Sequence, residues 1–103
     1  MKHFLIKYHF KEGSPEAWRQ HIAEFISALE NDPELKGRIA YRVMKHRDGS
    51  GYCHLAAASD DQAAGALGRK DFFKRYTEET RRVAGGEVEV LPLELIAETT
   101  YRA

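Results

Sequence analysis

Histidine and tyrosine are the residue types in this chain whose spacing could support chemistry. His54 shares one face of a predicted strand with Tyr52, and the preceding hairpin brings Tyr41 to the same face. An imidazole among phenols can act as a general base toward an acidic phenol or enol, because its ordinary pKa lies near neutral pH. The alternative is a histidine that is hydrogen-bonded to a neighbouring hydroxyl in a packed sheet, and the pattern leaves both interpretations open.

The remaining candidates are weaker. Lys7 and His9 share one face of the first predicted strand, where they could bind an anionic group or be a solvated pair. The histidines form no H-x-x-x-H or H-E-x-x-H pair, so we expect no metal site. Cys53 is the only cysteine, which excludes an internal disulfide and a Cys-rich zinc or iron–sulfur site. We expect it to be an inert, small hydrophobic residue.

The elements that must position these residues follow from the hydrophobic periodicity. Together they give the order β-α-β-β-α-α-β, the ferredoxin-like arrangement of an α+β fold with a four-stranded antiparallel sheet. Right-handed crossovers predict the strand order 4-1-3-2, and Pro92 agrees with an edge position for the last strand. The predicted strands cover residues 3–10, 38–46, 52–59 and 87–96, the predicted helices begin at Pro15, Gln62 and Asp71, and Glu98–Arg102 is a tail or a continuation.

Capping and turn residues set the predicted boundaries. Ser14-Pro15 is a strong helix start, and Asn31-Asp32-Pro33 ends that helix. The hairpin loop Arg47–Gly51 contains the glycines that positive φ angles require. Gly68 is expected to break or kink the second helix. Gly85-Gly86 stops the third helix, just after Arg81 and Arg82, whose charge suits a helix C-terminus.

Composition restricts the function classes. A chain of 103 residues fits a single domain over residues 1–103, and 16 Lys and Arg balance 16 Asp and Glu. Because the chain has no net charge to attract a polyanion, we expect neither a nucleic-acid partner nor an anionic membrane partner. No stretch approaches the apolar length of a membrane span, and residues 1–4 lack the apolar core of a signal peptide. We therefore expect a reduced, cytoplasmic protein.

The face of the sheet that the helices leave uncovered predicts a homodimer. Such a face should be polar if it meets water, yet both candidate faces mix apolar and charged residues. On the first strand the second face is His3, Leu5, Lys7 and His9. Two sheets packed face to face around a partly wet chamber would bury this surface. The alternative is a monomer with a semi-polar open face.

Five segments, taken in order, resemble the antibiotic biosynthesis monooxygenase-like domains of the dimeric α+β barrel superfamily. Their order and spacing carry the resemblance, which covers nearly the whole chain. The segments are Phe10–Gly13, Pro33–Gly37, Ser59–Ala63, Lys70–Lys74 and Gly85–Val90.

This resemblance implies a homodimer with small-molecule cavities formed by the sheets and the second helical region. Some members of the family oxidise polyketide phenols without a cofactor, some degrade haem, and many have no assigned reaction. The resemblance turns Tyr8 inward, where the polarity of the first strand would instead turn His9 inward. It also places Phe73 and Tyr76 at the cavity.

The chain departs from the family pattern at several positions. Ala58 stands where the third strand often ends in Trp, and Leu67 stands where a histidine is common. The haem-degrading branch needs an iron-ligating histidine where this chain has Thr77, and no histidine follows His54. Haem degradation is therefore not expected.

Together with this resemblance, the sequence predicts a small-molecule enzyme without a cofactor, a monooxygenase or an isomerase, that acts on an aromatic or enolic compound. His54 would be the catalytic base, and Tyr8, Tyr41, Phe73 and Tyr76 would bind the substrate. The alternative is a non-catalytic homodimer of the same fold that binds a small ligand or serves in a stress response, because fold alone does not fix function.

Overall fold

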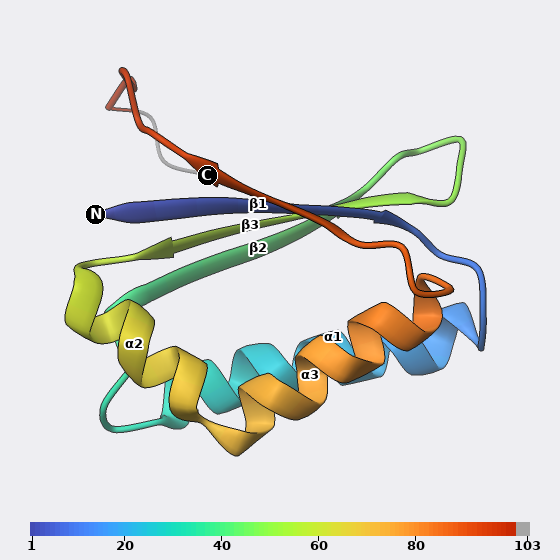
Figure 1. The fold of residues 1–103 in the computed structure, drawn as a ribbon, viewed down its shortest axis with the longest axis horizontal. Coiled ribbons are helices and arrows are strands. Elements are labelled where there is room, and N and C mark those ends of the chain that lie inside the picture. The colour runs from blue at the N-terminus through green and yellow to red at the C-terminus, as the bar shows by residue number, and fades with distance from the viewer. Residues whose placement is uncertain (101–103) are drawn as a thin grey trace.

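The computed structural model describes residues 1–100 as two layers, a sheet and a layer of helices (Figure 1). The two layers are joined by short loops along most of the chain. The strands are β1 (Lys2–His9), β2 (Ile39–Lys45), β3 (Gly51–Ala58) and β4 (Glu89–Leu93), and the helices are α1 (Pro15–Asn31), α2 (Asp61–Arg69) and α3 (Asp71–Val83).

The sheet is antiparallel throughout, and its strand order β2-β3-β1-β4 confirms the predicted order. Pro92 lies in the edge strand β4, where a residue without an amide hydrogen is tolerated. The register places His54 opposite Ile6 of β1 and opposite Val43 of β2. These pairs share one face, because directly opposed residues point to the same side of a sheet.

Helix α1 supplies much of the core between the two layers. It begins as predicted, with the Ser14 hydroxyl accepting a hydrogen bond from the Ala17 amide at 3.3 Å, and it ends at Asn31. One stripe of this helix is buried against the sheet and α3, because its apolar residues recur every three or four positions. The stripe consists of Trp18, Ile22, Phe25 and Leu29.

Two predictions about glycines are wrong. Helix α2 runs through Gly68 to Arg69, because the Asp60 cap and the burial of one apolar face outweigh a helical glycine, which costs about 1 kcal/mol. The hairpin glycines do not adopt positive φ. Gly51 instead lies under the ring of His46, since a Cβ there would meet ring atoms at 3.1 Å.

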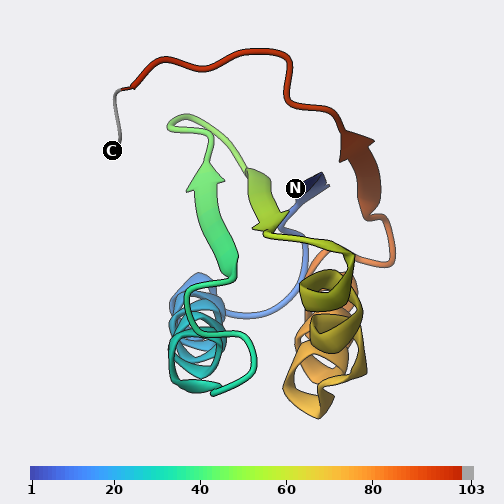
Figure 2. The same cartoon turned by 90° about the vertical axis from the view of Figure 1, so that its left-hand side faces the viewer.

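The last strand is shorter than predicted. Strand β4 ends at Leu93, and residues 94–100 continue as an exposed segment that arches over the sheet face opposite the helices (Figure 2). We call the face opposite the helices the open face; it carries Leu5 of β1 and Leu91 of β4. The final part of the predicted tail, residues 101–102, lies outside the described residues.

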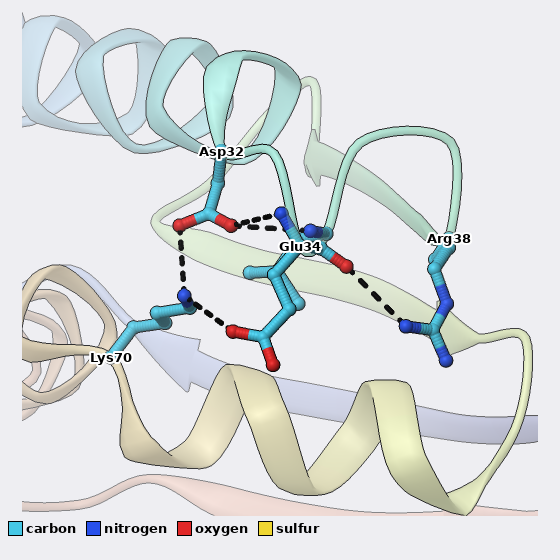
Figure 3. A network of polar contacts seen from close by, with 5 residues as sticks. Asp32, Glu34, Arg38 and Lys70 are labelled. Atoms are coloured by element: carbon cyan, nitrogen blue, oxygen red, sulfur yellow. Dashed lines mark hydrogen bonds and ion pairs between the residues drawn. The ribbon is translucent and has the colours of Figure 1, made fainter.

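A charged network ties the junction between α2 and α3 to the loop after α1 (Figure 3). The Lys70 ammonium lies 3.1 Å from a carboxylate oxygen of Asp32 and 2.8 Å from one of Glu34. Asp32 also accepts hydrogen bonds from the amides of Glu34 and Leu35 at 2.8 and 3.2 Å. The network therefore fixes where α3 begins relative to α1.

Candidate functional site

A cavity of about 340 Å³ lies between the sheet and the helices α2 and α3. Its size falls in the range of small-molecule sites. Most of its walls are apolar. The lining residues are Phe4, Ile6, Ile39, Tyr41, His54, Ala56, Ala57, Ala58, Ala64, Leu67, Gly68, Phe73, Tyr76, Thr77, Thr80, Arg81, Val88 and Val90.

The cavity exists because small side chains face each other across the two layers. Ala56 and Ala58 of β3 line it from the sheet, and Ala64 and Gly68 of α2 line it from the helices. Larger side chains at these positions would fill the space. Ala58 is also the position where the resembled family often has Trp, so this departure leaves room for a ligand.

His54 is fully buried on β3 and is the centre of the polar part of the cavity. Its Nε2 atom lies 2.7 Å from the Tyr8 hydroxyl. Its Nδ1 atom lies 2.7 Å from the Tyr41 hydroxyl and 3.2 Å from the Tyr76 hydroxyl. Behind this group, the Trp18 indole donates a hydrogen bond to the Tyr8 oxygen at 2.9 Å. We call these five residues the His54 cluster.

Hydrogen-bond satisfaction sets the direction of the protons in the cluster. The Trp18 indole can only donate, so the Tyr8 oxygen accepts from it. The buried Tyr8 hydroxyl then donates its single hydrogen bond to Nε2 of His54, since no other acceptor within residues 1–100 contacts it. A neutral imidazole with Nε2 as acceptor carries its proton on Nδ1 and donates it toward Tyr41.

Because Nδ1 of His54 donates its hydrogen bond, a phenolic proton of Tyr41 or Tyr76 is left for a ligand. With Nδ1 acting as a donor, neither Tyr41 nor Tyr76 can give its hydroxyl proton to the imidazole. One of the two hydroxyls can bond to the other, and at least one proton then remains for a ligand in the cavity that both residues line. The cluster is therefore arranged to donate hydrogen bonds to an oxygen atom of a bound molecule.

Burial keeps the cluster uncharged at neutral pH. It lowers the pKa of His54 to about 4, so the expectation of a near-neutral pKa is corrected. Burial also raises the pKa of Tyr8 and of Tyr41 well above the usual value for a phenol. The pKa of Tyr76 is raised by burial and further by the neighbouring Tyr41. The phenols thus remain hydrogen-bond donors.

The structure brings most of the predicted site residues together. Tyr41, His54, Phe73 and Tyr76 all line the cavity. Tyr8 is on the same face of the sheet but lies behind His54, outside the cavity lining.

The other candidates lie elsewhere. Lys7 and His9 are exposed on the open face, and the His9 ring contacts the Ser50 hydroxyl at 3.1 Å. The chamber that the sequence analysis placed between two sheets would be on that face, whereas the cavity described above lies between the sheet and the helices of a single chain.

Trp18 is the member of the cluster that the sequence analysis did not select. Its side chain is only 1% exposed, and its ring packs edge-on against Tyr8 and stacks on Tyr76. A usable signal was present, since Trp18 lies on the inner stripe of its helix and a buried indole N–H needs an acceptor. The sequence did not indicate which acceptor it would find.

Within residues 1–100, no group of three or more His, Cys, Asp or Glu side chains is placed to hold a metal ion. None of the helices in the same range is long and apolar enough to cross a membrane.

Solved structures with the same fold are numerous, although neither a family model nor a curated protein matches the sequence. SnoaB, a cofactor-independent oxygenase from Streptomyces nogalater, is similar with a TM-score of 0.75 and 14% identity over 97% of this chain and 98% of its own. Rv0793 from Mycobacterium tuberculosis has a TM-score of 0.76 and 12% identity over 96% and 98%. A structure described as an antibiotic biosynthesis monooxygenase has a TM-score of 0.65 and 13% identity over 94% and 100%.

These likenesses establish the fold. The chain has the α+β, ferredoxin-like fold of the antibiotic biosynthesis monooxygenase-like proteins, which confirms the resemblance drawn from its sequence segments.

Proposed function

We propose that the protein is a cofactor-independent oxygenase that acts on an aromatic phenol or enol. The observation that carries the proposal is the His54 cluster, which places phenolic donors at the buried end of an apolar cavity. The apolar walls suit an aromatic skeleton, and the donors suit one oxygen atom on it. The likeness to SnoaB, a cofactor-independent oxygenase, supports the same reading.

The reaction needs stabilisation of an oxyanion more than it needs a strong base. Tyr41 and Tyr76 donate hydrogen bonds to the substrate oxygen and so favour its ionised form. The substrate proton leaves to solvent water, the ionised substrate transfers electrons to O2, and a carbon–oxygen bond forms. The peroxide takes up a proton, and the O–O bond then breaks with loss of water as the remaining C–H bond on that carbon is lost. A methylene group is thereby oxidised to a carbonyl, and O2 is the only oxidant.

His54 acts in this scheme as a positioning residue. Its Nε2 atom is occupied by Tyr8 and its pKa is about 4, so it is a poor acceptor for the substrate proton. Its contribution is to orient the hydroxyl groups of Tyr41 and Tyr76 through Nδ1.

A second candidate is ligand binding without turnover. The same closed hydrogen-bond cluster supports it, because His54 offers no free lone pair to remove a proton. In either case we expect a homodimer formed through the open face, where Met44, Leu91 and Leu93 are 46%, 36% and 44% exposed.

Oxygen consumption with an anthrone that carries phenolic hydroxyls tests the proposal. The wild-type protein should consume oxygen well above the rate of the substrate alone. Tyr41→Phe should lower kcat by about 100- to 1000-fold, the range expected for loss of one donor to an oxyanion.

Tyr52→Phe is the matched control, because Tyr52 is also a tyrosine on the helix-facing side of the sheet, is more buried than Tyr41, stacks on Tyr8 and does not line the cavity. Oxygen consumption no faster than in buffer, together with saturable binding of the anthrone, would favour the second candidate. Equal rates for Y41F and Y52F would contradict the assigned donors.

A further inference from the structure

Among residues 1–100, Arg81 is the only formally charged residue that lines the cavity. It lies on α3, is exposed, and takes part in no ion pair or side-chain hydrogen bond within residues 1–100. The next residue differs on both counts: Arg82 is paired with Glu79 at 2.9 Å and does not line the cavity. A positive charge near a helix C-terminus is favourable for Arg81 and Arg82 alike. This effect therefore does not account for the position of Arg81 at the cavity.

The cavity has a buried end and an open end. His54, Tyr76 and Thr80 are buried, whereas Arg81 and Val90, which is 57% exposed, lie where the cavity meets solvent. Phenolic donors therefore occupy the buried end, and a cation without a partner occupies the open end.

The geometry of α3 places Tyr76 and Arg81 at opposite sides of the cavity. At about 100° per residue, Tyr76 and Arg81 are about 140° apart around α3, and Phe73, Thr77 and Thr80 project between them. The two residues thus mark opposite borders of the helix face that lines the cavity. They are also separated by about 7.5 Å along the helix axis, and both side chains lean toward the helix N-terminus.

We propose that the natural ligand carries an anionic group, of the carboxylate type, at the end remote from the oxygen held by the His54 cluster. Arg81 binds that group at the open end of the cavity. This inference rests on the proposed function, because it takes the cavity as the ligand site. The proposal narrows the substrate class to aromatic acids. Their phenolic or enolic oxygen would be separated from the carboxylate by about the length of two fused rings.

The chemistry of a guanidinium supports this pairing. Its planar fork matches a carboxylate with two parallel hydrogen bonds, and such pairs are stronger than neutral ones. A ligand lying against Val88 and Val90 would partly shield the pair from water. Since Arg81 is exposed, the gain should be moderate, on the order of a tenfold change in affinity.

Binding of 6-hydroxy-2-naphthoate and of its methyl ester, measured by calorimetry, tests the proposal. In the acid, the hydroxyl and the carboxylate lie at opposite ends of two fused rings. The wild-type protein should bind the acid about tenfold more tightly than the ester, and added salt should weaken binding of the acid alone. Arg81→Gln should remove the preference for the acid and leave the ester unaffected, while Arg82→Gln should change neither.

Three results would overturn the inference: equal binding of acid and ester, no binding of the acid, or the same effect from R81Q as from R82Q. The assay requires no turnover, so it separates this inference from the proposed reaction. Loss of oxygen consumption with an intact, Arg81-dependent preference for the acid would overturn only the reaction. Oxygen consumption without that preference would overturn only the role of Arg81.

Discussion

The histidine at the centre of the site is held by hydroxyl groups on both of its ring nitrogens. His54 contacts Tyr8 through Nε2 and Tyr41 and Tyr76 through Nδ1, and it is fully buried. Such an arrangement favours the neutral imidazole, because the charged form would be desolvated without a carboxylate nearby. His54 therefore orients the neighbouring hydroxyl groups more readily than it accepts a proton.

The protonation of His54 predicts how stability depends on pH. Its pKa is about 4 in the folded protein and 6.5 when unperturbed, so protonation below pH 6.5 favours the unfolded chain. Stability from this residue is complete above pH 6.5 and is lost as the pH falls toward 4. At about 1.4 kcal/mol for each tenfold change in proton affinity, the full loss is about 3 kcal/mol.

Urea unfolding of the wild-type protein and His54→Gln at pH 7.5 and pH 4.5 measures this effect. The difference in unfolding free energy between the two proteins should shrink by about 2 to 3 kcal/mol at the lower pH. His21→Gln provides the control for the substitution itself, since it replaces an exposed histidine rather than a buried one. A difference that does not change with pH would contradict a neutral, buried imidazole.

At the scale of single elements, the helices α2 and α3 fix the shape of the site. Helix α2 contributes small residues to the cavity wall, and α3 contributes Tyr76 and Arg81. Lys70 lies between the two helices and binds Asp32 and Glu34 of the loop after α1, so the pair is anchored at its junction. The other end of α3 is closed by Gly85 and Gly86, both at positive φ.

Two glycine-to-alanine substitutions should therefore have opposite effects. Gly65 is an exposed helical residue of α2 whose added Cβ would meet only the mobile end of Arg69, at 3.4 Å. Gly65→Ala should raise the unfolding free energy by about 0.5 to 1 kcal/mol. Gly86 has a φ of 90°, which L residues rarely adopt, so Gly86→Ala should lower the unfolding free energy by about 1 kcal/mol.

Thermal unfolding of the two variants beside the wild type provides the measurement. Their melting temperatures should move in opposite directions. A shift of the same sign in both would show that backbone conformation is not what distinguishes these two positions.

At the scale of the whole molecule, one face of the sheet has no covering layer of helices within residues 1–100. The helices pack on a single side, and residues 94–100 arch over the other side while remaining exposed (Figure 2). Leu91 and Leu93 of β4 and Met44 of β2 present apolar surface there. A second copy of the chain is the proposed cover for this face.

Sedimentation velocity at micromolar concentration tests the proposed dimer. The wild type should sediment with the mass of two chains, and Leu91→Glu should sediment as one chain, because a charge would be buried against the partner's sheet. Ala23→Glu, on the exposed side of α1, is the matched control and should leave the mass unchanged. A wild-type protein that sediments as one chain would refute the dimer.

The sequence alone determined the order of the elements and the topology of the sheet. Ser14 marks the start of α1, Gly85-Gly86 the end of α3, and Pro92 the edge strand, because caps, turns and proline restrictions act over a few residues of chain. Alternation along the strands also grouped Tyr41, Tyr52 and His54 on one face. Such local signals do not depend on how the layers pack.

Only the tertiary structure decided what these residues do together. Nothing local to Trp18 indicates that its indole contacts Tyr8, although that one contact sets the direction of every proton around His54. The cavity likewise results from small side chains that are distant in the sequence and meet across two layers. How deeply a side chain is buried depends on the packing of the whole chain. This packing buries His54 and so keeps its imidazole neutral, and it leaves Arg81 exposed at the open end of the cavity.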